Sequence, residues 1–173
     1  DALKNLYLIA KKNDCDFVFS DFKRIIDSKN QRDKTFNYDN DKIFDRSELL
    51  QHMQKEINDP SLGHLGLFGC NGRLIKRSVI ENGKIRFVEE LRFLEDKTFC
   101  WDLFGKINSA VYIRKQLYSY YVYPDVQTAI TKSINHGFEV GYFELITKKI
   151  ENSFKSFGLT TNKIEQLVDQ GLI

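Results

Sequence analysis

The hydrophobic pattern at the start of the chain predicts a helix followed by a strand. Four apolar residues of segment 1–12 fall on one helical face: Leu3, Leu6, Tyr7 and Ala10. Asp1 stands at the N-cap position, and Asn13-Asp14 ends the helical pattern. Residues 15–22 then alternate well enough for a strand and contain the strand-favouring residues Phe and Val. A helix followed by a buried strand predicts an α/β layer.

A polar stretch separates this unit from a second helical pattern. Residues 27–42 are rich in Asn, Asp, Lys, Gln and Arg, which predicts a solvent-exposed hairpin or loop. Asp45 then supplies an N-cap, with Glu48 three residues later at the spacing of a capping box. Apolar positions continue to a stop before Pro60, so we expect a helix of about three turns.

The middle of the chain predicts a helix, a short strand and a second helix. Residues 74–82 have apolar positions at helical spacing, and Asn82-Gly83 gives a stop signal. Residues 84–87 alternate charged and apolar side chains, as a short half-buried strand does. The second helix is expected near Glu95, and four apolar residues form its stripe: Phe99, Leu103, Phe104 and Ile107.

Glu95 and Asp96 therefore fall in the first turn of a predicted helix. Carboxylates are stabilised there, because the free N–H groups and the helix dipole offer partial positive charge. An acidic pair at a helix start is more often a cap than a pair of catalytic groups, so the residues alone leave both interpretations open.

The remainder of the chain predicts two short strands within residues 106–123 and helices over residues 133–157 and from Asn162 onward. The strands are rich in tyrosine. Tyrosine rings can stack on sugar rings or on a nucleobase, and they can equally fill a partly wet edge of a sheet.

Composition narrows the classes of protein. The 173 residues are 42% hydrophobic, which suffices for one globular domain. The balance of 26 basic and 24 acidic residues argues against a nucleic-acid partner. Cys15, Cys70 and Cys100 are widely spaced without a CxxC motif, so neither a disulfide framework nor a zinc site is expected. No apolar run approaches the roughly 20 residues that cross a bilayer, and a reducing, cytoplasmic compartment is the expected location.

Three segments together resemble the second half of the catalytic domain of family 2 glycosyltransferases, the bacterial nucleotide-sugar enzymes that build capsules and lipooligosaccharides. The central segment is RLIKRSVIENGKIRF followed by LEDKTF, which matches a basic and apolar stretch before a Glu-Asp pair and a helix. The opening DALKNLYLIAKKNDCDFVFSDFKRI is similar to the helix and strand after that family's metal-binding Asp-x-Asp. The Tyr-rich strand and polar turn correspond to LYSYYVYPDVQTAITKS.

The resemblance implies a fold, a division of the chain and an activity. The fold is a partial GT-A-like, Rossmann-related mixed sheet flanked by helices. Residues 1–132 would form the acceptor-side half of that domain, and residues 133–173 a C-terminal helical extension. The activity would be transfer of a sugar from a nucleotide-sugar donor to a growing surface glycan, or to a lipid-linked acceptor. The first half of the catalytic domain is expected outside this chain, which would then be a fragment of a longer enzyme.

The resemblance also implies roles for particular residues. Asp96 would be the general base, with Glu95 as its neighbour or the alternative base. The candidates for contacts to acceptor or donor are Arg73, Lys76, His64, Tyr121 and Thr128. Each of the basic residues, taken singly, also fits a surface charge, and a lone loop histidine is more often a surface residue.

A divalent metal, Mn²⁺ or Mg²⁺, is implied for the complete enzyme, with its main motif outside this chain. Asp39 and Asp41 have Asp-x-Asp spacing, but they come after the opening helix and strand rather than before them, so a turn is expected and no metal ligand is assigned. Two alternatives stay open. The chain would otherwise be a non-catalytic carbohydrate-binding or assembly domain, and its terminal helices would either pack on the sheet or lie on the inner face of a membrane.

Overall fold

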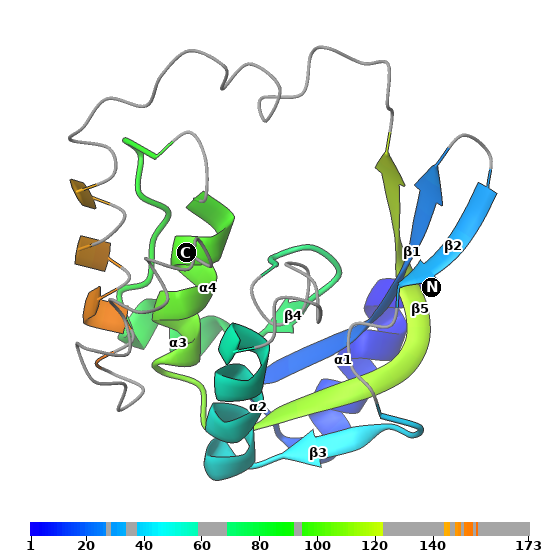
Figure 1. The fold of residues 1–173 in the computed structure, drawn as a ribbon. Coiled ribbons are helices and arrows are strands. Elements are labelled where there is room, and N and C mark those ends of the chain that lie inside the picture. Colours follow the sequence, from blue (N-terminus) through cyan, green and yellow to red (C-terminus); the bar gives the residue numbers. More distant parts are fainter. Residues whose placement is uncertain are drawn as a thin grey trace.

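The computed structural model describes residues 1–26, 29–33, 38–58, 69–91, 95–122, 144–145, 148–149, 151–153 and 155 (Figure 1). Helix α1 (Ala2–Asn13) opens the chain as expected. The Asp1 carboxylate caps it by accepting a hydrogen bond from the backbone N–H of Leu3 at 3.1 Å. At the other end Asp14 takes the left-handed conformation with φ 42°, which ends the helix.

The sheet is mixed, and its two longest strands lie side by side at the centre. β1 (Phe17–Ile26) and β5 (Ala110–Val122) pair in parallel. β2 (Lys29–Asp33) and β3 (Lys42–Phe44) add antiparallel edges in the order β2-β1-β5-β3. β4 (Leu74–Ile75) pairs with the first residues of β1, on the side away from β5. This arrangement confirms the mixed α/β fold class and the hairpin expected after β1.

Alternation along β1 and β5 gives each sheet face its own core. Val18 points to the face that α1 covers, where it packs with Leu6, Val111 and Ile113. The opposite face carries a larger aromatic core that includes side chains from α2 (Arg46–Asn58) and α4 (Glu95–Phe104). Figure 1 shows α1 behind the sheet and α2 in front of it. The helices therefore sandwich the central strands.

The predicted capping box at the start of α2 is present. The backbone N–H of Asp45 donates to Glu48 Oε2 at 3.2 Å, and the N–H of Glu48 donates to Asp45 Oδ1 at 2.9 Å. Next to it, the Arg46 guanidinium reaches across to the last turn of α4. It donates to the carbonyls of Phe104, Gly105 and Ile107. Helix α2 therefore begins and α4 ends at one connected set of hydrogen bonds.

Three details of the sequence prediction were wrong. Residues 74–75 form β4 rather than the start of a helix, and only α3 (Arg77–Asn82) is helical, with the stop at Gly83 as expected. Residues 84–87 form no strand: Ile85 is buried while Phe87 is half exposed, whereas an alternating strand would place both on one face.

The third correction concerns residues 106–123, which were expected to form two short strands. They contain the single strand β5 instead, and its register against β1 shifts on both sides of Asp21. At this irregularity, a neighbouring turn accepts one backbone hydrogen bond from β5. The N–H of Arg114 donates to Asp41 Oδ1 at 2.7 Å.

The described residues between 144 and 155 are helical, in agreement with the helix predicted over 133–157. Asp102 on α4 holds this segment, since its carboxylate accepts hydrogen bonds from Lys149 at 3.2 Å and from Ser153 at 2.7 Å. The helix predicted from Asn162 lies outside the described residues. Within the described part of the chain, no helix is long and apolar enough to span a bilayer.

Candidate functional site

The acidic pair begins α4, as the sequence predicts. Glu95 and Asp96 occupy the first turn, and both side chains are half-buried. Asp96 Oδ1 accepts a hydrogen bond from the backbone N–H of Lys97 at 2.7 Å. Partial burial also lowers the pKa of the Lys97 ammonium, although the charge of Asp96 opposes that shift.

Asp96 lines a small cavity that four segments of the chain build together. The cavity measures about 30 Å³, and its wall combines aromatic rings with polar groups: Phe22, Gly69, Asn71, Arg73, Asp96, Tyr118 and Tyr120. A cavity needs about 10–15 Å³ of such space to hold one water molecule. The cavity therefore suits a hydroxyl group rather than a whole sugar ring.

Strand alternation explains which tyrosines reach the cavity. Tyr118 and Tyr120 are two residues apart on β5, so their side chains lie on one face, and Tyr121 points to the other. Tyr120 is 37% exposed at the rim. Gly72 brings the 69–73 segment against Tyr118, because a Cβ at Gly72 would lie 2.7 Å from Tyr118 Cβ. Its φ of 66° also favours glycine.

Arg73 brings positive charge to the same cavity. Its guanidinium donates to the backbone carbonyl of Ser20 at 3.0 Å and to that of Gly69 at 3.4 Å. The guanidinium carbon also lies 5.5 Å from the centroid of the Phe19 ring, within range of a cation–π contact. These contacts fix an arginine beside a carboxylate at one opening, which is a suitable arrangement for a polar, hydroxyl-rich ligand.

A pair of thiols lies directly behind the cavity. Cys70 Sγ and Cys100 Sγ are 3.4 Å apart, and the Cys70 thiol donates to the backbone carbonyl of Asp96 at 3.5 Å. The hydrogen bond between the thiols lowers the pKa of Cys70 and raises that of the buried Cys100. No local pattern in the sequence indicates this pair, because 29 residues separate the two cysteines and only Cys100 lies in a helix.

The structure brings only some of the predicted site residues together. Arg73 and Asp96 share the cavity wall, and Glu95 stands beside Asp96 without lining the cavity. Lys76 lies outside it, where its Nζ atom is 3.2 Å from Asp14 and 3.8 Å from Asp16. His64, Thr128 and their surroundings lie outside the described residues.

The sequence did not predict most of the other residues that line the cavity. Phe22 and Asn71 carried no motif, and Tyr118 and Tyr120 were noted only as members of a tyrosine-rich strand. Alternation could have separated these two tyrosines from Tyr121, once the segment was known to be one strand. The position of Asn71 depends on how the 69–73 segment packs against Tyr118 of β5, which no local pattern encodes.

The described residues do not fit a divalent metal. No group of three or more His, Cys, Asp or Glu side chains gathers among them in a way that could hold an ion. Asp39 and Asp41 form the expected turn, since Arg114 takes the Asp39 carbonyl and the Asp41 carboxylate as hydrogen-bond acceptors. β5 thus holds the Asp41 carboxylate and the backbone carbonyl of Asp39.

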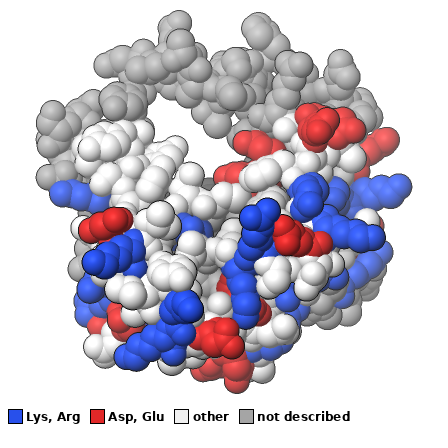
Figure 2. Space-filling model, turned by 180° about the vertical axis from the view of Figure 1, so that it is seen from behind, with Lys and Arg blue, Asp and Glu red and all other residues white. Residues whose placement is uncertain are grey.

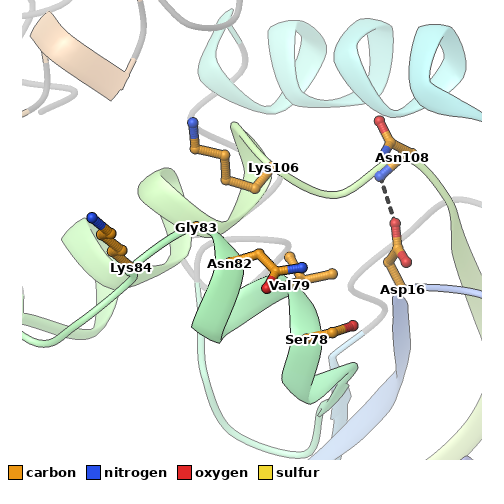
Figure 3. Close-up of a pocket in the computed structure, with 8 residues that line it drawn as sticks. All are labelled: Asp16, Ser78, Val79, Asn82, Gly83, Lys84, Lys106 and Asn108. Carbon is orange, nitrogen blue, oxygen red and sulfur yellow. Dashed lines mark hydrogen bonds between the residues drawn. The ribbon is translucent and has the colours of Figure 1, made fainter.

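A second, larger cavity of about 350 Å³ lies between α3 and the α4–β5 connection (Figure 3). Asp16 on its wall is already bound to the backbone N–H of Asn108 at 2.9 Å. Figure 3 shows the Lys84 and Lys106 side chains on the other side of the cavity, away from that carboxylate. The charged groups do not converge on one point, so this cavity is the weaker candidate.

The distribution of charge on the face in Figure 2 does not indicate a binding surface. Figure 2 shows Lys and Arg side chains interspersed with Asp and Glu over the face in view. This mixture agrees with the net charge of +2.

The chain was also compared with known proteins. No model of a known protein family matches it, and no curated protein sequence does. The observations that bear on function are the geometry of the Asp96 cavity and the resemblance of the three sequence segments.

Proposed function

We propose that this chain is the acceptor-side half of a nucleotide-sugar-dependent glycosyltransferase, in which Asp96 is the general base. The observation that carries the proposal is the cavity in which Asp96, Arg73 and two tyrosines meet. The sequence resemblance had selected Arg73 and Asp96 from two parts of its central segment. Their common cavity supports the idea that the two residues belong to one site.

On this proposal the cavity receives the attacking hydroxyl of the acceptor. Asp96 removes the proton from that hydroxyl as its oxygen bonds to the anomeric carbon of the donor sugar. The bond between that carbon and the diphosphate oxygen breaks in the same displacement. A half-buried carboxylate is well placed for this step, because reduced contact with water strengthens its interaction with the hydroxyl proton.

The neighbouring groups would orient the acceptor. The partly exposed ring of Tyr120 offers an apolar face on which a sugar ring can stack, next to the opening that admits one hydroxyl. The positive charge of Arg73 on the cavity wall would favour an acidic acceptor. The partners would be a nucleotide-sugar and a glycan or lipid-linked acceptor at the cytoplasmic side of a membrane. The metal-binding motif would lie in the missing half.

A non-catalytic carbohydrate-binding domain is the second candidate, and one observation favours it. Asp96 Oδ1 already accepts the backbone N–H of Lys97, as expected for a carboxylate that stabilises a helix start. In that case the tyrosines and Arg73 would hold a glycan without any reaction. Binding would then survive the removal of the Asp96 charge and would need no metal.

The test is a transfer assay of the longer parent enzyme with a panel of nucleotide-sugars and Mn²⁺ or Mg²⁺. Wild type is compared with Asp96→Asn and with Asp14→Asn, a matched change of a carboxylate whose side chain is 93% exposed. We expect turnover to be lost only in Asp96→Asn, with donor binding retained. Transfer that is equal in both variants would contradict the proposed base. Metal-independent glycan binding without transfer would favour the binding domain.

A further inference from the structure

Cys70 and Cys100 form a thiol pair whose geometry calls for an explanation. Their sulfur atoms are 3.4 Å apart, and a disulfide bond of about 2.05 Å requires an approach of little more than 1 Å. Cys15 is separated from this pair, since it belongs to the small core under α1. Of the three free cysteines, two are therefore placed to react with each other.

We infer that Cys70 and Cys100 are a modification site that peroxides convert to an intramolecular disulfide. The inference stands independently of the proposed sugar transfer, because it depends only on the two sulfur atoms and their surroundings. The reagent class is a small hydroperoxide, with hydrogen peroxide as the simplest member.

The surroundings assign different roles to the two sulfurs. Cys70 is half-buried and is flanked by the cavity-lining residues Gly69 and Asn71, whereas Cys100 is only 2% exposed. A reagent therefore meets Cys70 first. The hydrogen bond from Cys100 lowers the pKa of Cys70 and so favours its thiolate, although burial and the nearby carboxylates of Asp96 and Glu95 oppose that shift.

The reaction balances in two steps. The Cys70 thiolate attacks one peroxide oxygen, the S–O bond forms as the O–O bond breaks, and the departing hydroxide takes a proton to become water. The Cys100 sulfur then attacks the sulfenic sulfur of Cys70. The S–S bond forms as the S–O bond breaks, and the second hydroxide leaves as water with the Cys100 proton. Two thiols are oxidised, and hydrogen peroxide is reduced to two molecules of water.

The disulfide would act on the Asp96 cavity through two contacts. Oxidation removes the S–H group that donates to the Asp96 carbonyl. It also ties the segment that carries Asn71 and Arg73 covalently to α4, one helical turn beyond Asp96. The cavity wall would therefore have one arrangement when the two thiols are reduced and another when they form a disulfide.

The test is peroxide oxidation of the folded chain, followed by denaturing alkylation, intact-mass measurement and peptide mapping. Wild type and the control Cys15→Ser should each lose the mass of two hydrogen atoms and yield a Cys70–Cys100 peptide pair, and dithiothreitol should reverse both changes. In Cys100→Ser, a dimedone adduct should accumulate on Cys70. In Cys70→Ser, Cys100 should remain without a dimedone adduct.

Wild type and Cys15→Ser decide the question even if a variant of the pair fails to fold. The same oxidation in concentrated urea should be slower and should give mixed pairings that include Cys15, since the fold no longer positions the sulfurs. The inference is overturned if folded wild type keeps Cys70 and Cys100 open to alkylation, pairs either of them with Cys15, or carries only higher oxides on Cys70.

Discussion

The two ends of α4 differ in what their polar groups contact. At the C-terminal end, the Arg46 guanidinium donates hydrogen bonds to the backbone carbonyls of Phe104, Gly105 and Ile107. At the N-terminal end, Asp96 faces a cavity and has a pair of thiols behind it. One end of the helix is therefore held by interactions that serve stability, whereas we propose that the other end presents Asp96 to a ligand.

The largest expected effect on stability is at the C-terminal end of α4. Arg46→Met would remove the charged donor from the carbonyls of Phe104, Gly105 and Ile107, and we expect a loss of about 3 kcal/mol in the free energy of unfolding. Urea denaturation measures it. The matched control is Arg77→Met, which removes an exposed pair with Glu81 and should cost less than about 0.5 kcal/mol. Equal losses in the two variants would refute the special role of Arg46.

A second prediction concerns the N-terminal end, where one glycine is required for the shape of the cavity. Gly72→Ala adds a Cβ 2.7 Å from Tyr118 Cβ at a backbone φ of 66°, so we expect a loss of about 2–3 kcal/mol. Gly72→Asn separates the two causes, because asparagine tolerates positive φ but keeps the close contact. Similar losses would identify the contact as the main cause, and an unchanged unfolding midpoint in Gly72→Ala would contradict the packing described.

The third prediction concerns His52 on α2 and the dependence of folding stability on pH. Burial lowers the pKa of His52 from 6.5 to about 4, and its Nδ1 atom is 3.0 Å from the Tyr38 hydroxyl oxygen. The unfolded chain binds the proton more tightly, so stability falls as the pH drops from 6.5 towards 4, by about 2–3 kcal/mol in all. His52→Asn should remove that component from the pH profile of unfolding. Superimposable profiles of wild type and variant would contradict the shift.

The smallest expected effect separates the two members of the acidic pair. Glu95 does not line the cavity, so Glu95→Gln should change stability by less than about 0.5 kcal/mol, the size of a weak dipole interaction. In the transfer assay of the parent enzyme, its turnover should stay within a few-fold of wild type. A loss comparable to that of Asp96→Asn would instead make Glu95 the base.

The sequence predicted those parts of the molecule whose cause is local. The cap at Asp1, the capping box at Asp45 and the acidic start of α4 all depend on residues within one turn, and the structure confirms each. The expected strand over 84–87 failed because Ile85 packs beneath the end of α3, where its N–H donates to the Ile80 carbonyl. Tertiary packing outweighed a short alternating pattern.

The candidate site was predictable only in part, for the same physical reason. The helix-start pattern located Asp96, and the resemblance singled out both Asp96 and Arg73 as site residues. The meeting of Cys70 with Cys100, and of Asn71 with Tyr118 and Tyr120, depends on how the 69–73 segment packs against β5 and α4. Such contacts between distant segments leave no periodic signal in the chain.

The central claim is that the two ends of α4 have separate roles, and turnover per folded molecule of the parent enzyme tests it most directly. We predict that Asp96→Asn lowers this turnover by about 10²–10⁴-fold while its stability changes by less than about 1 kcal/mol. Arg46→Met should lose stability yet keep its turnover per folded molecule. If Asp96→Asn keeps full turnover, or if both variants lose turnover only in proportion to their unfolded fraction, the claim is wrong.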